Sequence, residues 1–598
     1  LMAPCCCARR LPLLIERIQN NDNFKLRFPD NADRASVSLK KQAGVYVQGA
    51  GGGDIVINAN NIELFKLTTL SAGIGKDVGT SETVGGDITL NATGKINIED
   101  SPDIANSKST IINDVRQGSK GQAGNINITA KGEVFVANST ILSQVEAGGV
   151  GNSGDIYVNS ASLKLQNGAQ LLTSIKEPSE KRPGGRGNAG NIEVKVTGLV
   201  DIAGKRGDVP SGISSRLNAG AEGNGGNITI NAGSFKLRDS TFITASTIGK
   251  GSAGNVNVTA SGEVFVEKSI ILSQVEAGGI GKGGNISIDA ASLKLENGAQ
   301  LLASSLGKGS AGNVDVITRG GEVLLKNSIV SAQSITGNTG DITITSPKIT
   351  LDNQSRLNSE SASGDGGDIK LNSNLLLLRR NSSISTNAGT ERKGGDGGNI
   401  NINSKFIVAI PKENSNITAN AFNGRGGNVT ITTKNQGIFG IEARPLESAS
   451  TSDITASSEN GAQGEVSIAE PDIDPNRGLI ELPSNLTDAS QQIAQGCTSG
   501  GVRSASKFTP TGKGGIPENP YEPLRQRAVI TKWVTLPNDE KIKEEMATRL
   551  TSTTTAIVEA QSLVISRGEV KLMAQVPERH YYTLAEPTMF NCNTPTSQ

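Results

Sequence analysis

A three-residue motif, Gly-Asx-(Ile/Val), recurs along most of the chain, and its spacing restricts the possible folds more than any other feature. Its Asx residues are Asp54, Asp87, Asn125, Asp155, Asn191, Asn227, Asn255, Asn285, Asn313, Asp341, Asp368, Asn399 and Asn428. Neighbouring copies therefore follow one another at a period of about 30 residues, and periods of this length are typical of solenoids. One unit of a solenoid cannot bury its own apolar face and must stack on the next unit.

A single repeat contains three short apolar runs. In the unit 254–282 these runs begin at Val256, Val264 and Ile271, and the first two alternate apolar with polar residues. Alternation over four to six residues between Gly, Ser and Asn is typical of strands. Three strands per unit predict an all-β fold, a right-handed parallel β-helix of about 13–14 coils. At about 4.8 Å per coil, thirteen coils measure roughly 60 Å.

The Gly-Asx pair is expected to form a corner of each coil. Glycine tolerates a positive φ at a sharp turn, and asparagine enters that region more readily than most residues. If every coil places its Asx at the same corner, the side chains can stack into a ladder along the axis. We therefore interpret the thirteen Asx residues as a structural ladder of turn formers, without a metal-binding, cofactor-binding or catalytic role.

Two blocks of the chain are close copies of each other. Residues 120–174 and 250–304 align without a gap, and 38 of the 55 pairs are identical. Ile126 and Ile128 become Val256 and Val258, which are the conservative exchanges that a packed core tolerates. Outward positions are expected to vary more, and Tyr157, for example, is replaced by Ser287 in the second block. The comparison indicates a tandem duplication with a constrained interior, and it argues against a single active site.

The repeats separate three regions. Residues 1–45 are non-repetitive and are expected to be a cap or a truncated start, since the chain begins with Leu. Residues 46–470 form the predicted β-helix. Residues 471–598 are interpreted as a linker or cap, with a β-hairpin near 556–575 that turns at Arg567-Gly568. Polar, Gly- and Pro-containing insertions are expected to leave the coils as loops, at 175–190, 203–212 and 387–398.

Charge and cysteine content exclude some partners and leave one pairing open. Lys plus Arg and Asp plus Glu number 58 each, so the composition gives no electrostatic argument for a nucleic-acid partner. A membrane-spanning helix needs about 20 consecutive apolar residues, and no such run occurs, which predicts that there is no transmembrane helix. Cys5, Cys6 and Cys7 lie at the start, whereas Cys497 and Cys592 could form a disulfide if the chain is exported.

The motifs of the repeats and the tail identify a related group of proteins. The repeats include GGDITLNA, GGNITINA and GGNISIDAASLKL, and the tail carries LPSNLTDASQQIAQGC, FTPTGKGGIPENPYEPL and IVEAQSLVISRGEVKLMAQ in that order. In these features the chain after about residue 45 resembles the cyanobacterial filamentous-haemagglutinin-type large exoproteins, which are passengers of two-partner secretion systems. The N-terminal secretion domain of that family is not visible in the sequence. We expect either that it was lost upstream of the first residue or that the chain is a fragment or a degenerate copy.

The resemblance implies a function and a location. We expect a secreted or outer cell-surface exoprotein that acts as a rod-like adhesin or structural protein without catalytic activity or cofactors. Its implied partner is an outer-membrane two-partner-secretion transporter, and its adhesion targets are surface glycans or other cells.

Two alternatives remain from other functional classes. Polysaccharide lyases and glycoside hydrolases can also be β-helices, but they need clustered carboxylates with a basic residue or a calcium site. The single histidine, His580, lies in the tail, and Asn replaces Asp freely in the ladder. A crystal-binding solenoid would need a regular Thr array, and the Thr residues near 341–345 and 427–433 do not recur from coil to coil.

Overall fold

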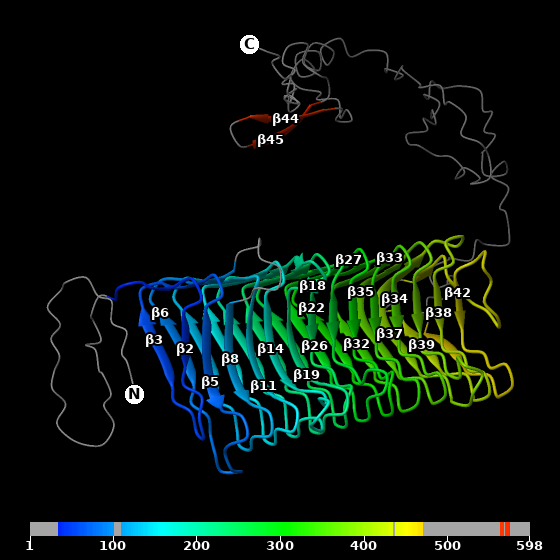
Figure 1. Ribbon diagram of the computed structural model, residues 1–598. Helices are drawn as coiled ribbons and strands as arrows, with labels where there is room; N and C mark the ends of the chain where they lie inside the picture. Colours follow the sequence, from blue (N-terminus) through cyan, green and yellow to red (C-terminus); the bar gives the residue numbers. More distant parts are fainter. Residues whose placement is uncertain (1–33, 101–108, 434–436, 470–561, 567–568, 574–598) are drawn as a thin grey trace, which may run out of the picture. The chain divides into compact units, whose positions relative to one another are not determined.

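The structure is a computed structural model that describes residues 34–100, 109–433, 437–469, 562–566 and 569–573. The chain divides into two compact units, Leu1–Leu482 and Pro483–Gln598. The described residues of the first unit form strands and turns without any helix, stacked coil on coil (Figure 1). The all-β, solenoid-like arrangement predicted from the repeats is therefore confirmed.

Two large sheets, here called sheet A and sheet B, form the walls of the solenoid. Within the described residues sheet A has 26 strands and sheet B has 15 strands, and the neighbouring strands of both sheets pair in parallel. A typical coil contributes two strands to sheet A and one to sheet B. Each coil therefore has the three strands that the sequence predicts, with turns between them.

Sheet A is built from two rows of strands. The first strands of the coils are β3 (Ile55–Ala59), β6 (Ile88–Ala92), β9 (Ile126–Ala130), β12 (Ile156–Ser160), β15 (Ile192–Val196), β20 (Ile228–Ala232), β23 (Val256–Ala260), β26 (Ile286–Ala290), β29 (Val314–Thr318), β32 (Ile342–Thr345), β39 (Val429–Thr432) and β43 (Val466–Ala469). The second strands are β1 (Val37–Leu39), β4 (Ile62–Phe65), β7 (Ile96–Glu99), β10 (Glu133–Ala137), β13 (Ser162–Gln166), β16 (Leu199–Ala203), β21 (Ser234–Arg238), β24 (Glu263–Glu267), β27 (Ser292–Glu296), β30 (Val323–Lys326), β33 (Lys348–Asp352) and β40 (Ile438–Phe439). Two longer strands, β35 (Ile369–Leu378) and β37 (Ile400–Ala409), span both rows.

Sheet B contains the third strand of each coil and, at its edge, the short strand β41, which belongs to the same coil as β42. Its members are β2 (Gly44–Tyr46), β5 (Thr69–Ile74), β8 (Ser109–Val115), β11 (Ser139–Val145), β14 (Gln170–Ile175), β19 (Gly212–Leu217), β22 (Phe242–Thr244), β25 (Ile270–Leu272), β28 (Gln300–Leu302), β31 (Ile329–Ser331), β34 (Arg356–Asn358), β36 (Ser383–Ser385), β38 (Asn416–Thr418), β42 (Asp453–Thr455) and β41 (Glu442–Ala443).

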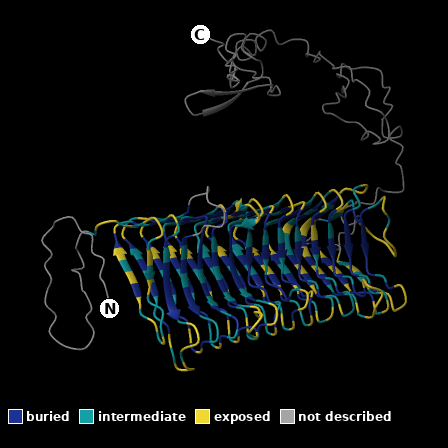
Figure 2. Ribbon diagram, in the orientation of Figure 1, coloured by how far each residue is buried: buried dark blue, intermediate teal, exposed yellow. Residues whose placement is uncertain are grey.

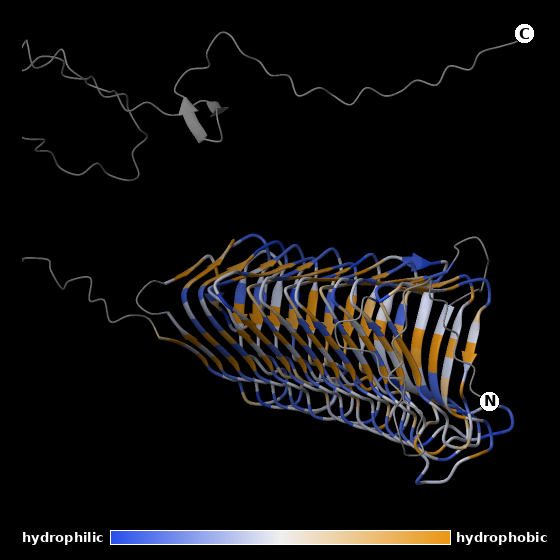
Figure 3. Cartoon of the chain, turned by 90° about the vertical axis from the view of Figure 1, so that its left-hand side faces the viewer, coloured by the Kyte–Doolittle hydropathy of each residue, from blue (hydrophilic) through white to orange (hydrophobic). Residues whose placement is uncertain are grey.

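The core is a thin column of apolar side chains, almost all of them aliphatic, enclosed by the two sheets. Val256 and Val258 are at most 1 % exposed, and in register they face Ile286 and Ile288 of the next coil. Ile126 and Ile128 are equally buried, so the predicted inward positions are confirmed. The alternation follows from the strand geometry, because successive side chains point to opposite faces. Buried and polar stripes alternate along the strands in Figures 2 and 3.

The insertions lie between strands, at the turns. Residues 203–212 contain a small antiparallel hairpin of β17 (Lys205–Arg206) and β18 (Val209–Pro210). The insertion after β14 forms a tight turn in which Ser179 and Arg182 exchange two backbone hydrogen bonds, of 3.0 and 3.3 Å. Both insertions leave the parallel register of the neighbouring strands intact.

The described stack begins before the predicted boundary at residue 46. Strand β1 pairs with β4 and β2 pairs with β5, so both belong to the sheets. In the second unit, β44 (Ser562–Ser566) and β45 (Glu569–Met573) pair antiparallel within the predicted hairpin region. The predicted turn at Arg567-Gly568, the histidine, all five cysteines and the other quoted tail motifs lie outside the described residues.

Candidate functional site

The Gly-Asx residues form one continuous hydrogen-bonded row beside the first strands of sheet A. In each step the backbone N–H of one Asx donates to the side-chain Oδ1 of the Asx one coil earlier. Twelve such bonds, from 2.7 to 3.2 Å, join Asp54, Asp87, Asn125, Asp155, Asn191, Asn227, Asn255, Asn285, Asn313, Asp341, Asp368, Asn399 and Asn428 in that order. The row links consecutive coils along the axis.

The bonding pattern explains why Asp and Asn exchange in this row. Asp155 and Asn227 both provide an Oδ1 atom to the next backbone N–H, at 2.7 and 2.8 Å. The other side-chain atom is not required for that bond, although Asn255 also donates from Nδ2 to Asn227 at 3.1 Å. A backbone role that needs only one oxygen makes the carboxylate and the amide equivalent.

The backbone geometry predicted for the Gly-Asx pair is wrong. None of the thirteen Asx residues, nor the glycine before each, has a positive φ. A Cβ atom on Gly254 would lie 2.0 Å from the carbonyl oxygen of Gly226, so the glycine is required by the close approach of two coils. Left-handed asparagines occur at another corner, between the second and third strands, for example Asn138 and Asn297 with φ of 49° and 55°.

A second, shorter row lies three residues before the first and was not predicted. Asn188 donates its backbone N–H to Asn152 Oδ1 at 2.8 Å, and Asn224 donates in the same way to Asn188 at 3.0 Å. In later coils Asp396 donates to Asp365 at 2.9 Å. The signal is present in the sequence as a second Asx in GNSGD, GNAGN, GNGGN and GDGGD. Composition alone assigns these residues to loops and does not reveal the row.

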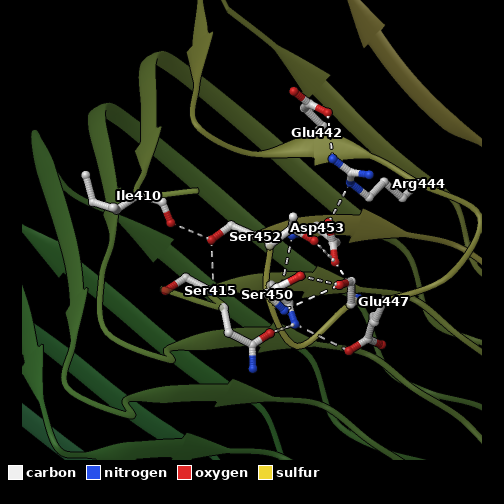
Figure 4. A network of polar contacts seen from close by, with 12 residues as sticks. Ile410, Ser415, Glu442, Arg444, Glu447, Ser450, Ser452 and Asp453 are labelled. Atoms are coloured by element: carbon white, nitrogen blue, oxygen red, sulfur yellow. Dashed lines mark hydrogen bonds and ion pairs between the residues drawn. The ribbon is translucent and has the colours of Figure 1, made fainter. Parts of the chain in front are cut away.

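A network of charged and polar side chains lies at the C-terminal end of sheet B (Figure 4). Residues 444–451, here called the strap, connect β41 to β42. Asp453 in β42 is fully buried and accepts hydrogen bonds from Ser448 N at 2.7 Å and Thr451 Oγ1 at 3.0 Å. Arg444 Nε lies 2.9 Å from Asp453 Oδ1 in an ion pair that lacks hydrogen-bond geometry. Asp453 therefore anchors both ends of the strap.

Glu447 in the strap reaches the neighbouring strand β38. Its carboxylate accepts from Asn420 Nδ2 at 2.8 Å and from Asn416 Nδ2 at 3.4 Å. Because these two asparagines flank Thr418 on the same face, the carboxylate spans the threonine, which is 4 % exposed. Thr418 donates to Ser385 Oγ at 3.1 Å. The strap thus rests on a polar layer of the sheet.

The polar layer continues to a further carboxyl group two strands away. Ser385 donates to Glu360 Oε1, and Arg356 lies on the same strand edge. Burial raises the pKa of Glu360, although the hydrogen bond from Ser385 and the positive charge of Arg356 each act to lower it. Burial also raises the pKa of Glu447; the hydrogen bonds from Asn420 and Asn416 oppose this, and the negative charges of Asp453 and Glu360 add to it. Three carboxyl groups and two guanidinium groups are therefore spread over four consecutive coils, from β34 to β42.

A single buried carboxyl group lies towards the other end of sheet B. Asp114 in β8 is 2 % exposed and faces Gly73 and Gln144 in register. Gln144 donates to both carboxyl oxygens, from N and from Nε2, at 3.1 Å each. Burial raises the pKa of Asp114 to about 8, helped by the charge of Glu146 and opposed by Gln144 and Arg116.

The insertion after β14 folds back across earlier coils. Arg182 Nη2 lies 2.6 Å from Asp77 Oδ1, although 105 residues separate the two. On the way the arginine side chain passes Gly148 and Gly118, where added Cβ atoms would lie 3.1 and 1.8 Å from its atoms. The loop and the corner beneath it line an open hollow of about 700 Å³ whose lining includes Lys76. The insertion therefore clasps several coils from outside.

One charged pair is retained in both duplicated blocks. Lys164 Nζ lies 2.7 Å from Glu133, and Lys294 Nζ makes the equivalent contact with Glu263 at 2.5 Å. The pair faces outward on the second row of sheet A. Hydrogen bonding to the carboxylate raises the pKa of each lysine. The duplicated surfaces therefore share an ion pair that joins two coils, which the sequence comparison did not single out.

Comparisons of the chain with protein-family models, with curated proteins and with solved structures found no match. Among the described residues there is no group of three or more His, Cys, Asp or Glu side chains that is arranged to hold a metal ion. Within the same part of the chain no helix has the length and apolar character needed to cross a membrane.

Proposed function

We propose that the chain is a secreted or cell-surface exoprotein whose right-handed parallel β-helix acts as a rod-like adhesin or structural element without catalytic activity. The observation that carries the proposal is the contrast between the two faces of sheet A. Inward positions stay apolar in every coil, whereas the outward position that follows the first inward residue of the first strand differs from each coil to the next. In register it is Asn127, Tyr157, Glu193, Thr229, Asn257 and Ser287.

A surface of this kind suits many weak contacts better than one specific site. Contacts that are weak singly add up when several copies of a rod are displayed together, because the second contact is intramolecular. Surface glycans or other cells are the proposed targets, and an outer-membrane two-partner-secretion transporter is the proposed export partner. Both proposals rest on the resemblance of the repeats and tail motifs.

Binding of the full chain at low and high valency tests this function. Beads that carry many copies and a monomeric form of the chain would be compared for retention on cells and on glycan-coated surfaces. We expect retention to rise steeply with the number of copies per bead. Equal affinity of the monomer and the bead-bound chain for one defined ligand would contradict a multivalent adhesin.

A carbohydrate-active enzyme is the second candidate, and one observation favours it. Glu360, Glu447 and Asp453 lie with two arginines along four consecutive coils of sheet B, and such enzymes need carboxylates together with basic residues. Against this, Asp453 is fully buried and held by Arg444 and by the strap backbone. Incubation of the full chain with pectins, alginates and glucans would distinguish an enzyme from an adhesin. Release of unsaturated or reducing ends, lost in the Glu447→Gln variant, would favour the enzyme.

A further inference from the structure

The strap, residues 444–451, is attached to the solenoid almost entirely through polar groups. Leu446, its one large apolar side chain, is 73 % exposed and contributes nothing to attachment. The contacts that hold the strap are those of Arg444, Ser448 and Thr451 with Asp453, those of Glu447 with two asparagines at β38, and a backbone hydrogen bond from Arg444 N to Ile454 O at 3.0 Å. A segment without an apolar anchor relies on electrostatics for its closure, and its closure therefore depends on charge state.

The face beneath the strap is polar as well. Thr418 and Thr455 point outward from β38 and β42, since Ile417 and Ile454 beside them lie in the core. Thr455 is fully buried, and its Oγ1 has no hydrogen-bond partner. Burying such a group without a partner costs free energy, so closure of the strap is opposed by the layer that it covers.

The charged groups around Glu447 decide in which direction protonation acts. Asp453 faces it from β42, while Arg356 lies in β34, two strands beyond β38, and Glu360 follows that strand. Within β41 and the strap, Glu442 and Arg444 are ion-paired with each other at 3.0 Å. Arg444 is shared with Asp453, and Glu447 takes part in none of the ion pairs of the described residues. Burial and the negative charges of Asp453 and Glu360 disfavour an ionised Glu447, and together they outweigh the hydrogen bonds from Asn420 and Asn416, which favour it.

We propose that the strap is a proton-controlled cover, closed over the polar outer face of β38 and β42 when Glu447 is neutral and released when Glu447 ionises. Release would uncover Thr418, Ser385 and the asparagine side chains that Glu447 now engages. The raised pKa of Glu447 sets the direction in which closure of the strap depends on pH. Closure is favoured fully below the pKa of the free side chain and is lost as the pH rises through the higher pKa of the closed state.

Amide hydrogen exchange of the full chain, corrected for intrinsic rates, tests the proposal between about pH 4 and about pH 8. We expect amide exchange of residues 444–451 to accelerate with rising pH. The acceleration should be about tenfold for each pH unit by which closure of the strap raises the pKa of Glu447. Exchange in β23 serves as the internal reference for an intact solenoid.

Two variants separate Glu447 from general effects of pH. Glu447→Gln keeps a side-chain oxygen for Asn420 but cannot ionise, so the strap should stay protected at all pH values. Glu391→Gln, in the loop where Glu391 pairs with Lys393 at 2.9 Å, is the matched control and should behave as the parent. Equal protection of the parent strap across the range, or an unchanged pH dependence in Glu447→Gln, would overturn the proposal.

Discussion

Asn255 donates its backbone N–H to the side-chain Oδ1 of Asn227 at 2.8 Å, so a side chain of one coil satisfies the main chain of the next. The Oδ1 of Asn255 accepts from Asn285 in the same way, also at 2.8 Å. The row is therefore a set of side-chain-to-backbone bonds, in which each residue both donates and accepts.

Replacement of Asn255 by Asp should be tolerated, whereas replacement by Ala should not. Asp keeps the Oδ1 acceptor for Asn285 N–H, so we expect a loss below about 0.5 kcal/mol. Ala removes the acceptor, and we expect a loss of about 1 kcal/mol in the free energy of unfolding. Urea denaturation of both variants and of an Asn257→Ala control would check this. The prediction is wrong if Asp and Ala are equally destabilising.

Replacement of Val256 by Asp should be strongly destabilising. The side chain lies in the core between Ile228 and Ile286, and a carboxyl group there has no partner, so we expect a loss of roughly 3 kcal/mol or more. Thr259→Asp, at an exposed position of the same strand, is the control. The melting temperatures of the two variants should differ clearly. A Val256→Asp variant that melts at the same temperature as the parent would contradict the inward placement.

Replacement of Asp114 by Asn should stabilise the protein in alkaline solution. The folded state raises the pKa of Asp114 from 3.8 to about 8, so it favours the neutral carboxyl. That stabilisation is complete below the pKa of the unfolded chain and is lost as the pH rises through about 8. Asn imitates the neutral form at every pH. We expect the melting temperature of the variant to exceed that of the parent above pH 8 and to approach it in acid. Parallel pH profiles would refute this assignment.

The duplicated blocks provide a matched test of the Arg182 clasp. Gly148 and Gly278 occupy equivalent positions with φ of 72° and 89°, so an alanine strains both backbones. The added Cβ meets the Arg182 side chain at 3.1 Å only at Gly148, whereas Gly278 faces open space. We expect Gly148→Ala to cost about 1 kcal/mol more than Gly278→Ala. The excess should vanish in an Arg182→Ala background, and an excess that persists there would exclude the clasp as its cause.

The sequence predicted the interior better than the exterior, for a physical reason. Val256 and Val258 are placed inward by alternation alone, since each strand has one apolar face and the neighbouring coil repeats it. The Gly-Asx spacing likewise located the row correctly, but the positive φ assigned to it belongs to a different corner. A composition of Gly and Asn fits both a left-handed turn and a close approach of two backbones, and only the three-dimensional structure distinguishes them.

The features that depend on distant segments could not be inferred from local patterns. Asp114 follows Asn113 and reads as part of a polar turn, yet it lies within a strand because Gly73 and Gln144 pack on either side. The strap likewise reads as a Ser-, Pro- and Glu-containing loop. Its folding over β38 depends on Asn416 and Asn420, which belong to the preceding coil.

The direction of the Asx row bears on how such a chain changes length in evolution. Each bond is donated from a later coil to an earlier one, so the stack has a head and a tail, and a coil can be added only in that orientation. The offset between the duplicated blocks is the separation of Asn125 and Asn255, which equals four steps of the row. Gain or loss of whole coils is therefore the change that leaves every remaining donor with an acceptor, and the coil is the unit by which this gene can lengthen or shorten its product.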